Sequence, residues 1–246
     1  MDTETRTNPA PSPQDDGHPD FRLVLANTVH DMKNSVGVLL AALDDLDLRC
    51  AGEACASRDQ LARLRYEGRR LSTNLMQVLA LYRMEETGYT PNIGEHDACE
   101  LLEECLLEHA GMMEAAGMEM ELVCEEDELP AFFDRELVAG LIGSVINNAW
   151  KYSNRRIRLR ARRRRGYLEL AVEDDGRGYP ESMLTGTGNE PDSAHSGICF
   201  RSGSTGLGLY FARRIAALHQ HQQRRGFVSL DNEGIDGGGR FTLHLP

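Results

Sequence analysis

The hydrophobic positions in the first third of the chain repeat with the spacing of two long helices. Apolar residues between positions 21 and 49 lie alternately four and three residues apart, which is the heptad seam of a packed helix. Positions 58–86 repeat the alternation, and residues 50–57 between them lack it. Because a lone hairpin cannot enclose two apolar stripes, we expect two chains to pair into a four-helix bundle. The two seams are Leu25, Val29, Met32, Val36, Leu39, Leu43, Leu46 and Leu64, Gly68, Leu71, Leu75, Val78, Tyr82.

After a Gly- and Pro-containing stretch the pattern becomes a mixture of helices and strands. Asp97 and Asp134 are each placed to cap a helix, one predicted to end near residue 116 and the other near residue 152. Strands are predicted by alternation at 119–124, 155–165 and 167–174, by short apolar runs at 130–133 and 227–230, and at 240–245. A glycine-led helix is expected at 207–218. The chain is therefore predicted to be α+β, with a helical hairpin at 21–87, a linker at 88–96 and an α/β sandwich at 97–246.

Composition narrows the function classes. The chain has 246 residues, a net charge of -12 and a pI near 5.1, which argues against nucleic acid or an anionic membrane as the main partner. No apolar run approaches the roughly 18 residues of a membrane span. Residues 1–20 are polar and contain four prolines, so we expect a disordered tail rather than a signal peptide. These features predict a cytoplasmic protein, in which the six cysteines would be free thiols.

Two glycine motifs form the candidate binding site. Asp174, Gly176 and Gly178 follow a predicted buried strand, and the glycines would let backbone pass close to a ligand. The second motif opens the 207–218 helix, where unpaired N–H groups and the positive end of the helix dipole favour a phosphate. A carboxylate that can accept the amino group of adenine, a Gly- and Ser-rich lid and a phosphate cradle together indicate an ATP site. The residues of the second motif are Gly203, Thr205, Gly206, Leu207 and Gly208.

The end of the 134–152 helix adds a metal ligand and a cation. The side-chain oxygen of Asn148 is a suitable Mg²⁺ ligand, and Mg²⁺ binds nucleotide phosphates at the same time. Lys151 is one of only two lysines in the chain, and Tyr152 ends the helix beside it. A compact point charge at this place is suited to the same phosphates. The alternative from the residues alone is a surface helix end with a favourable cation.

These motifs resemble the N, G1 and G2 boxes of the nucleotide-binding domain of sensor histidine kinases. They are Asn148-Ala-x-Lys-Tyr152, Asp174-x-Gly-x-Gly178 and Gly206-x-Gly-Leu209. The resemblance implies the Bergerat (GHKL) type of ATP-binding sandwich, which gyrase and MutL share. The helix around His30 resembles the phosphoacceptor box of the same kinases, with Asp31 beside the histidine and Asn34 one turn further on.

The resemblance implies a two-component histidine kinase that uses ATP and Mg²⁺. His30 would attack the γ-phosphate, and the phosphoryl group would pass to an aspartate on the receiver domain of a response regulator. Asp31 can orient the imidazole of His30 and favour the tautomer with a free nucleophilic nitrogen. In such kinases an acid next to the histidine and an Asn three residues beyond it also support dephosphorylation of the regulator. The implied protein is a homodimer whose signal would come from a partner in trans or through the short N-terminal tail.

Three positions depart from the pattern of these kinases. Ser35 stands where many have proline, so a bend of the helix is not expected there. Ser144 stands four residues before Asn148, where the hydrolysing ATPases of the superfamily carry a water-activating Glu. The lid offers only Phe200 as an aromatic anchor. Three alternatives therefore stay open: a kinase-inactive phosphatase or His phosphotransferase, a dimeric module that sequesters a regulator, and a hydrolysing ATPase, which Ser144 disfavours.

Overall fold

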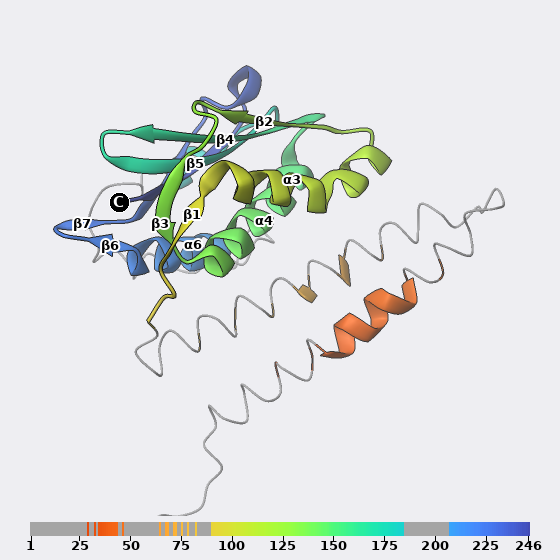
Figure 1. Cartoon of the computed structure of the whole chain (residues 1–246). Coiled ribbons are helices and arrows are strands. Elements are labelled where there is room, and N and C mark those ends of the chain that lie inside the picture. Colours follow the sequence, from red (N-terminus) through yellow and green to blue (C-terminus); the bar gives the residue numbers. More distant parts are fainter. Residues whose placement is uncertain are drawn as a thin grey trace, which may run out of the picture.

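The computed structural model describes two continuous parts of the chain, residues 90–184 and 207–246 (Figure 1). In the N-terminal part it describes residues 34–43 and a set of separate positions, and it assigns all of these to helices. The separate positions are residues 29, 32, 46, 64, 67–68, 71–72, 75, 78 and 82.

A five-stranded sheet is the centre of the C-terminal part. Its strands lie in the order β2 (Glu119–Cys124), β4 (Arg156–Arg164), β5 (Tyr167–Asp174), β9 (Arg240–Leu245), β8 (Phe227–Asp231). The β2–β4 pair is parallel and the other pairs are antiparallel. The sequence neighbours β4 and β5 turn through Arg165 and Gly166, both at positive φ, as a tight hairpin requires. Two small antiparallel pairs complete the strands: β1 (Gly94–Asp97) with β3 (Pro130–Phe133), and β6 (Gln220–His221) with β7 (Arg224–Arg225).

Three helices cover one face of this sheet: α3 (Ala98–Ala115), α4 (Arg135–Tyr152) and α6 (Leu207–Leu218) (Figure 1). Asp97 caps α3 by accepting from the backbone N–H groups of Cys99 and Glu100, and Asp134 caps α4 by accepting from Leu137. Both capping aspartates thus satisfy N–H groups that a helix start leaves unpaired. Two short elements, α5 (Glu181–Leu184) and the 3₁₀ turn η3 (Ile235–Gly237), lie in connections.

The core fills the space between the helices and the sheet. In β4 the residues Ile157, Leu159 and Ala161 are buried and alternate with arginines on the opposite face. That outer face is covered by ion pairs, such as Arg158 with Glu173 at 3.1 Å and Arg162 with Glu169 at 2.6 Å. The arginine run of 155–165 is therefore a strand with a charged outer face, as the alternation predicts.

Most predicted elements are confirmed, with boundaries that differ by a residue or two. The strands at 119–124, 130–133, 155–165, 167–174, 227–230 and 240–245 and the helices at 97–116, 134–152 and 207–218 are all present. The predicted linker 88–96 instead ends in strand β1, because residues 94–97 pair with β3. The β6–β7 hairpin was not predicted, since two-residue strands of polar residues carry no periodicity.

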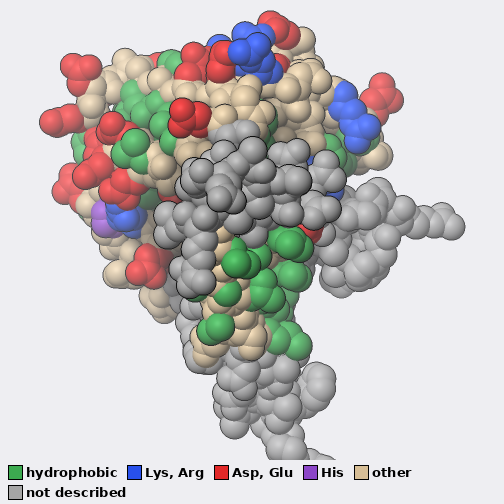
Figure 2. Space-filling model, turned by 90° about the vertical axis from the view of Figure 1, so that its right-hand side faces the viewer, with side chains coloured by type: hydrophobic (Ala, Val, Ile, Leu, Met, Phe, Trp, Pro, Cys, Tyr) green, Lys and Arg blue, Asp and Glu red, His purple; other side chains and the backbone are tan. Residues whose placement is uncertain are grey.

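Described residues of the two N-terminal helices lie close together at Gly68. Gly68 is buried, and a Cβ atom added there would lie 2.8 Å from the side chain of Leu40. Val29 and Leu43 are buried, whereas Met32, Leu39 and Leu46 from the same predicted seam are about half exposed. Figure 2 shows a group of hydrophobic side chains on the surface in its lower half. The extent of the hairpin, the tail and the dimer stay predictions.

The expectation that all cysteines are free thiols is wrong for two of them. Cys99 and Cys124 form a disulfide, because α3 packs against β2 and brings the two Cα atoms to 6.1 Å, a distance within the usual range for such bonds. Cys105 is a buried free thiol, and Cys50, Cys55 and Cys199 lie outside the described residues. In the part of the chain that the structure describes, no helix has the length and apolarity to cross a membrane.

Candidate functional site

Asp174 lies at the end of β5 and is 8% exposed. Its Oδ1 accepts from the backbone N–H groups of Gly176, at 2.8 Å, and Gly239, at 3.3 Å. Burial raises the pKa of this carboxyl above its ordinary value, although the two N–H groups act in the opposite direction. Among the described residues no donor contacts Oδ2, which leaves this oxygen able to accept a hydrogen bond from a ligand.

The neighbouring carboxylate of Asp175 has a structural role. It accepts from the backbone N–H groups of Asn154 at 2.9 Å and Arg155 at 3.0 Å, and so fixes the connection between α4 and β4. Burial alone would raise the pKa of Asp175, but these backbone N–H groups and that of Arg156 bring the pKa below its ordinary value. Two adjacent acids are therefore shifted in opposite directions, and Asp174 is the one suited to a ligand.

Gly176 joins the end of β5 to the end of α4. A Cβ atom at this position would overlap the carbonyl oxygen of Tyr152, so only glycine allows the approach. The ring of Tyr152 is contacted by two cations, with Lys151 Nζ 5.2 Å and the Arg177 guanidinium carbon 5.7 Å from its centroid. The predicted residues Lys151, Tyr152 and Gly176 thus lie together, with positive charge beside the Asp174 loop.

Gly178 has φ of 73°, in the left-handed region that favours glycine. The segment after it is held by Asn232, whose Oδ1 accepts from Tyr179 N at 2.7 Å and whose Nδ2 donates to Tyr179 O at 3.0 Å. A side chain at Gly178 would meet Asn232 at 2.7 Å. The loop after Asp174 therefore has a fixed backbone path, which Asn232 enforces from the distant β8–β9 connection.

Asn148 and Gly208 meet although they lie 60 positions apart. The Nδ2 atom of Asn148 is 3.8 Å from the place of a Cβ atom at Gly208, in the first turn of α6. Asn148 is exposed, so its amide remains accessible to a ligand at the start of α6. The packing of α4 on α6 thus brings two of the three predicted motifs close together, and the approach of Gly176 to Tyr152 adds the third.

Some residues that shape the site carried no sequence signal for this role. Gly238 and Gly239 lie between the paired strands β8 and β9. They also pack on Asp174: its N–H donates to the carbonyl of Gly239 at 2.9 Å, and a Cβ at Gly238 would overlap the Asp174 carbonyl. The repeated glycines were the available signal, but only the β5–β9 register reveals what they face.

His219 also has a role that the sequence did not suggest. It is 2% exposed at the end of α6. Its Nε2 accepts from the backbone N–H of Asp134 at 3.0 Å, and its Nδ1 donates to the carbonyl of Ile215 at 2.9 Å. Burial lowers the pKa of His219, so the ring is neutral when it accepts this bond. The end of α6 is thereby tied to the start of α4, and the spacing of the two site helices is fixed.

The remaining predicted residues divide into described and undescribed positions. Asn34 is exposed on the N-terminal helix, and the backbone of Leu207 begins α6. His30, Asp31, Gly203, Thr205, Gly206 and the lid residue Phe200 lie outside the described residues. Ser144 is 7% exposed on α4, so the position that bears glutamate in hydrolysing relatives offers no carboxylate here.

The geometry fits a nucleotide bound with Mg²⁺. Gly176 and Gly178 let the loop after Asp174 pack closely on Tyr152 and Asn232, and Gly208 lies beside Asn148 at the start of α6. In the described parts of the chain, no three His, Cys, Asp or Glu side chains could hold a metal by themselves. An ion at Asn148 would accordingly be shared with the phosphates of the nucleotide.

Comparison with known proteins matches the C-terminal part of the chain to one ATPase family. Residues 133–246 match the family described as "Histidine kinase-, DNA gyrase B-, and HSP90-like ATPase". This match and the similarity to histidine kinases support an ATPase core of the sensor histidine kinase type in this part of the chain.

Several curated relatives are histidine kinases. The histidine protein kinase DivJ of Caulobacter vibrioides is 26% identical over 198 residues, which is 79% of this chain and 33% of DivJ. The sensor-like histidine kinase SenX3 of Mycobacterium bovis is 26% identical over 227 residues, which is 90% of this chain and 53% of SenX3. The chain thus spans between a third and about half of the length of these relatives.

Solved structures share the fold. Full-length ShkA in complex with AMPPNP has a TM-score of 0.62 at 19% identity, covering 92% of this chain and 46% of ShkA. The Acinetobacter baumannii histidine kinase AdeS has a TM-score of 0.55 at 18% identity, covering 88% of this chain and 96% of AdeS.

Proposed function

We propose that this chain is a protein histidine kinase that binds ATP between α4, the Asp174 loop and α6, and transfers the γ-phosphoryl group to His30. The observation that supports this proposal is the proximity of three motifs from separate elements: Asn148 lies beside Gly208, Tyr152 lies against Gly176, and Asp174 accepts from the N–H of Gly176. The ShkA structure, which contains AMPPNP, has the same fold and supports a nucleotide as the ligand.

Each residue has a proposed role that follows from its chemistry. Asp174 Oδ2 accepts the amino group of adenine, and this hydrogen bond selects an amino-bearing base. The N–H groups that open α6 bind phosphate, helped by the helix dipole. Asn148 would hold Mg²⁺ together with the phosphates, and the ion would neutralise their charge. Lys151 adds a cation near the Asp174 loop, so that the protein contributes mainly position and charge, as phosphoryl transfer requires.

His30 is the proposed acceptor. Its imidazole attacks the γ-phosphorus, the bond to the β–γ bridging oxygen breaks, and ADP leaves. The receiver-domain aspartate of a response regulator then takes the phosphoryl group, as the kinase relatives suggest. With serine at position 144, α4 supplies no general base to activate water at that point, which favours transfer over hydrolysis.

A regulator phosphatase is a second candidate. Asn34 is exposed on the helix one turn beyond His30, where its amide could position a water molecule against a phosphorylated receiver domain. A labelled, phosphorylated regulator that loses label faster with the wild type than with Asn34→Ala would support this activity. An equal rate of loss would contradict it.

The kinase proposal is tested by incubating the chain with γ-labelled ATP and Mg²⁺. We expect acid-labile label on the wild type, no label on His30→Ala, and unchanged nucleotide binding by this variant in calorimetry. His221→Ala is the matched control, because His221 is exposed on β6 away from the motifs and its loss should leave labelling intact. Nucleotide binding without label would leave the phosphatase or relay function. No nucleotide binding would refute the proposal and leave a module that sequesters a regulator.

A further inference from the structure

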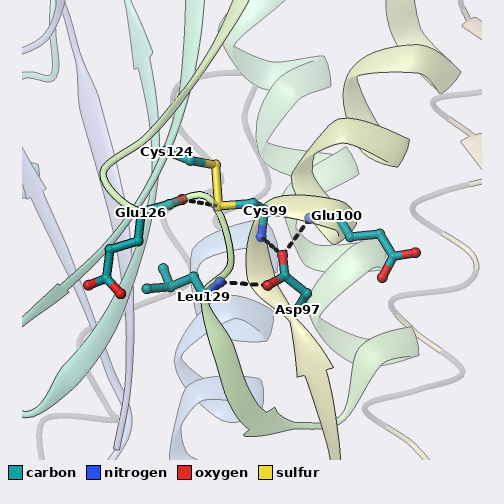
Figure 3. Close-up of a disulfide and its surroundings, with 6 residues drawn as sticks. All are labelled: Asp97, Cys99, Glu100, Cys124, Glu126 and Leu129. Atoms are coloured by element: carbon teal, nitrogen blue, oxygen red, sulfur yellow. Dashed lines mark hydrogen bonds between the residues drawn. A yellow bond between two sulfur atoms is a disulfide. The ribbon is translucent and has the colours of Figure 1, made fainter.

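The disulfide between Cys99 and Cys124 joins the first turn of α3 to the last residue of β2 (Figure 3). The two residues are 25 positions apart, and the bond closes the connection between the helix layer and an edge strand of the sheet. None of the proposed nucleotide contacts involves either cysteine. The bond is thus separate from the chemistry proposed above and needs its own explanation.

The residues around this bond keep the start of α3 in place in both the oxidised and the reduced state. Asp97 fixes the same region without the sulfurs: its Oδ1 accepts from Cys99 N at 2.8 Å, and its Oδ2 accepts from Leu129 N at 2.5 Å. The Ala98 N–H donates to the Leu129 carbonyl at 3.0 Å. Cys99 Sγ lies 3.7 Å from the carbonyl oxygen of Glu126, which would accept a hydrogen bond from the thiol in the reduced state. Neither state leaves the start of α3 unsupported.

A path for small reagents leads to Cys99. The residue is 8% exposed, but it lines an open depression of about 400 Å³. Five carboxylate residues border this depression: Asp97, Glu100, Glu103, Asp127 and Glu128. A concave surface lined by one sign of charge concentrates ions of the opposite sign and repels ions of its own. The entrance therefore discriminates between reagents by charge.

We propose that Cys99 and Cys124 are a reversible thiol–disulfide exchange site that reacts with cationic or neutral low-molecular-weight thiols and disulfides in preference to anionic ones. In oxidation, one protein thiolate attacks a reagent disulfide RSSR, forms a mixed disulfide and releases RS⁻. The second protein thiolate then attacks the protein sulfur of that mixed disulfide and releases a second RS⁻. The protein loses two electrons and two protons, and the reagent leaves as two RSH molecules. Reduction by two RSH molecules is the reverse.

Cys105 is an internal control on the same helix. It is a free thiol, 5% exposed, and burial raises its pKa to about 11, with further contributions from Glu108 and Glu104. Because the thiolate is the reactive form, Cys105 should stay reduced and unmodified under conditions in which the pair exchanges.

Reduction should loosen a defined segment. Residues 125–129 connect β2 to β3, and β3 leads directly to Asp134, the cap of α4. With the disulfide intact, this segment is held at Cys124 and again at Leu129. Without it, the segment keeps the Leu129 contacts and the bond from Glu125 N–H to the Ala161 carbonyl at 3.2 Å, but it loses its covalent link to α3. We expect faster hydrogen exchange in residues 125–129 after reduction and unchanged exchange around Asp174.

The test uses the full chain with Cys50, Cys55 and Cys199 replaced by serine. The reduced protein is treated with cystamine, which is cationic, or with glutathione disulfide, which is anionic, and bond formation is followed by maleimide-shift gels and peptide mass spectrometry. Rates are divided by those of the same reagents with a small dithiol peptide. We expect at least a tenfold preference for cystamine that falls towards unity in 1 M NaCl. The double substitution Glu100→Gln/Glu103→Gln should reduce this preference for cystamine, and Cys105→Ser should leave the preference unchanged.

Three results would overturn the proposal: equal normalised rates for the two reagents, alkylation of Cys99 and Cys124 as separate thiols under oxidising conditions, or a crosslink to Cys105 instead. The thermal midpoint of the wild type, measured before and after reduction, gives a test that does not depend on the folding of a variant. Reduction of the wild-type pair should lower the thermal midpoint by roughly 5–10 °C, whereas Cys99→Ser/Cys124→Ser should show no redox-dependent shift. None of these readouts requires kinase activity, so failure here leaves the proposed function standing, and the reverse also holds.

Discussion

Asp174 and Asp175 show how adjacent residues of one type take opposite roles. Asp175 faces backbone N–H groups that hold the start of β4, and these bonds bring its pKa below the ordinary value despite burial. Asp174 is buried at the end of β5, has its pKa raised by burial, and keeps one oxygen without a donor among the described residues. A carboxylate whose pKa is raised by burial, beside glycines, is typical of a binding site.

Asp174→Asn should separate binding from stability. Oδ1 of asparagine can still accept from Gly176 and Gly239, and the cost of a buried charge is removed. Because the native pKa of Asp174 is raised, its charged form destabilises the fold above that pKa, and this cost disappears as the pH falls through it. Nucleotide affinity at pH 7.5 should fall at least tenfold, since the lost hydrogen bond to a charged group contributes roughly 1.5–3 kcal/mol. Calorimetry measures the affinity, and the ligand-free thermal midpoint should be equal or higher.

The control for this substitution is Asp175→Asn, for which we expect the opposite effect on stability. The native pKa of Asp175 is lowered, so its carboxylate stabilises the fold above the unfolded pKa, and this contribution is lost as the pH falls through the native pKa. Asp175→Asn should lower the ligand-free thermal midpoint. A lower midpoint for Asp174→Asn, or full affinity in that variant, would contradict the roles given to the two carboxylates.

At the scale of elements, the site depends on the spacing of α4 and α6. Asn148 comes from the last turns of α4 and Gly208 from the first turn of α6, so any slide of one helix along the other would separate them. The Asp134–His219 hydrogen bond at 3.0 Å fixes the opposite ends of the same two helices. The histidine is therefore a structural part of the site, although it lies far from the motifs in sequence.

The stability of this domain should depend on pH through His219. Its native pKa is lowered by burial, as is that of His244, so below about pH 6.5 the unfolded chain binds protons that the native ring does not. The stabilisation is complete above pH 6.5 and is lost at lower pH, by up to about 1.4 kcal/mol per pH unit for each histidine. Denaturant unfolding at pH 7.5 and 5.5 should show this loss.

His219→Gln provides the comparison. It should be less stable than the wild type at pH 7.5 by about 1–3 kcal/mol, because the Asp134 N–H loses a buried partner, and it should lose less between the two pH values. His221→Ala, at an exposed histidine two positions away, should follow the wild type. A wild-type stability that is unchanged at pH 5.5 would refute the assignment of a neutral, buried His219.

At the scale of the whole molecule, charge and apolar surface are unevenly placed. The net charge is -12, yet the arginines of β4 pair with acids across the outer face of the sheet. The N-terminal helix is different: Val38, Leu39 and Leu46 expose 73%, 55% and 49% of their surface. Exposed leucines on a heptad seam are typical of helices that pack against a second chain.

Leu39→Glu tests whether this face pairs two copies. We expect the wild type to elute at twice the chain mass in light-scattering chromatography, and the variant to shift towards the monomer, because two charges would be buried in the bundle. Leu107→Glu is the matched control: Leu107 is 65% exposed on α3, outside the seam, and its substitution should not change the mass. A monomeric wild type, or identical masses for the two variants, would argue against the four-helix bundle.

The sequence by itself determined most of the elements and indicated where the candidate site lies. Alternation of apolar residues located β2, β4 and β5, aspartates marked the starts of α3 and α4, and glycines with one carboxylate indicated the candidate site. These features are local, because periodicity and capping depend only on residues a few positions apart.

Tertiary structure alone decided which distant residues meet. The packing of α3 on β2 joined Cys99 to Cys124, which spacing did not reveal. The β5–β9 register placed Gly239 on Asp174, and the ends of α4 and α6 met through His219. Contacts of this kind depend on strand order and helix packing, which are set by the burial of the whole core and leave no pattern among neighbouring residues.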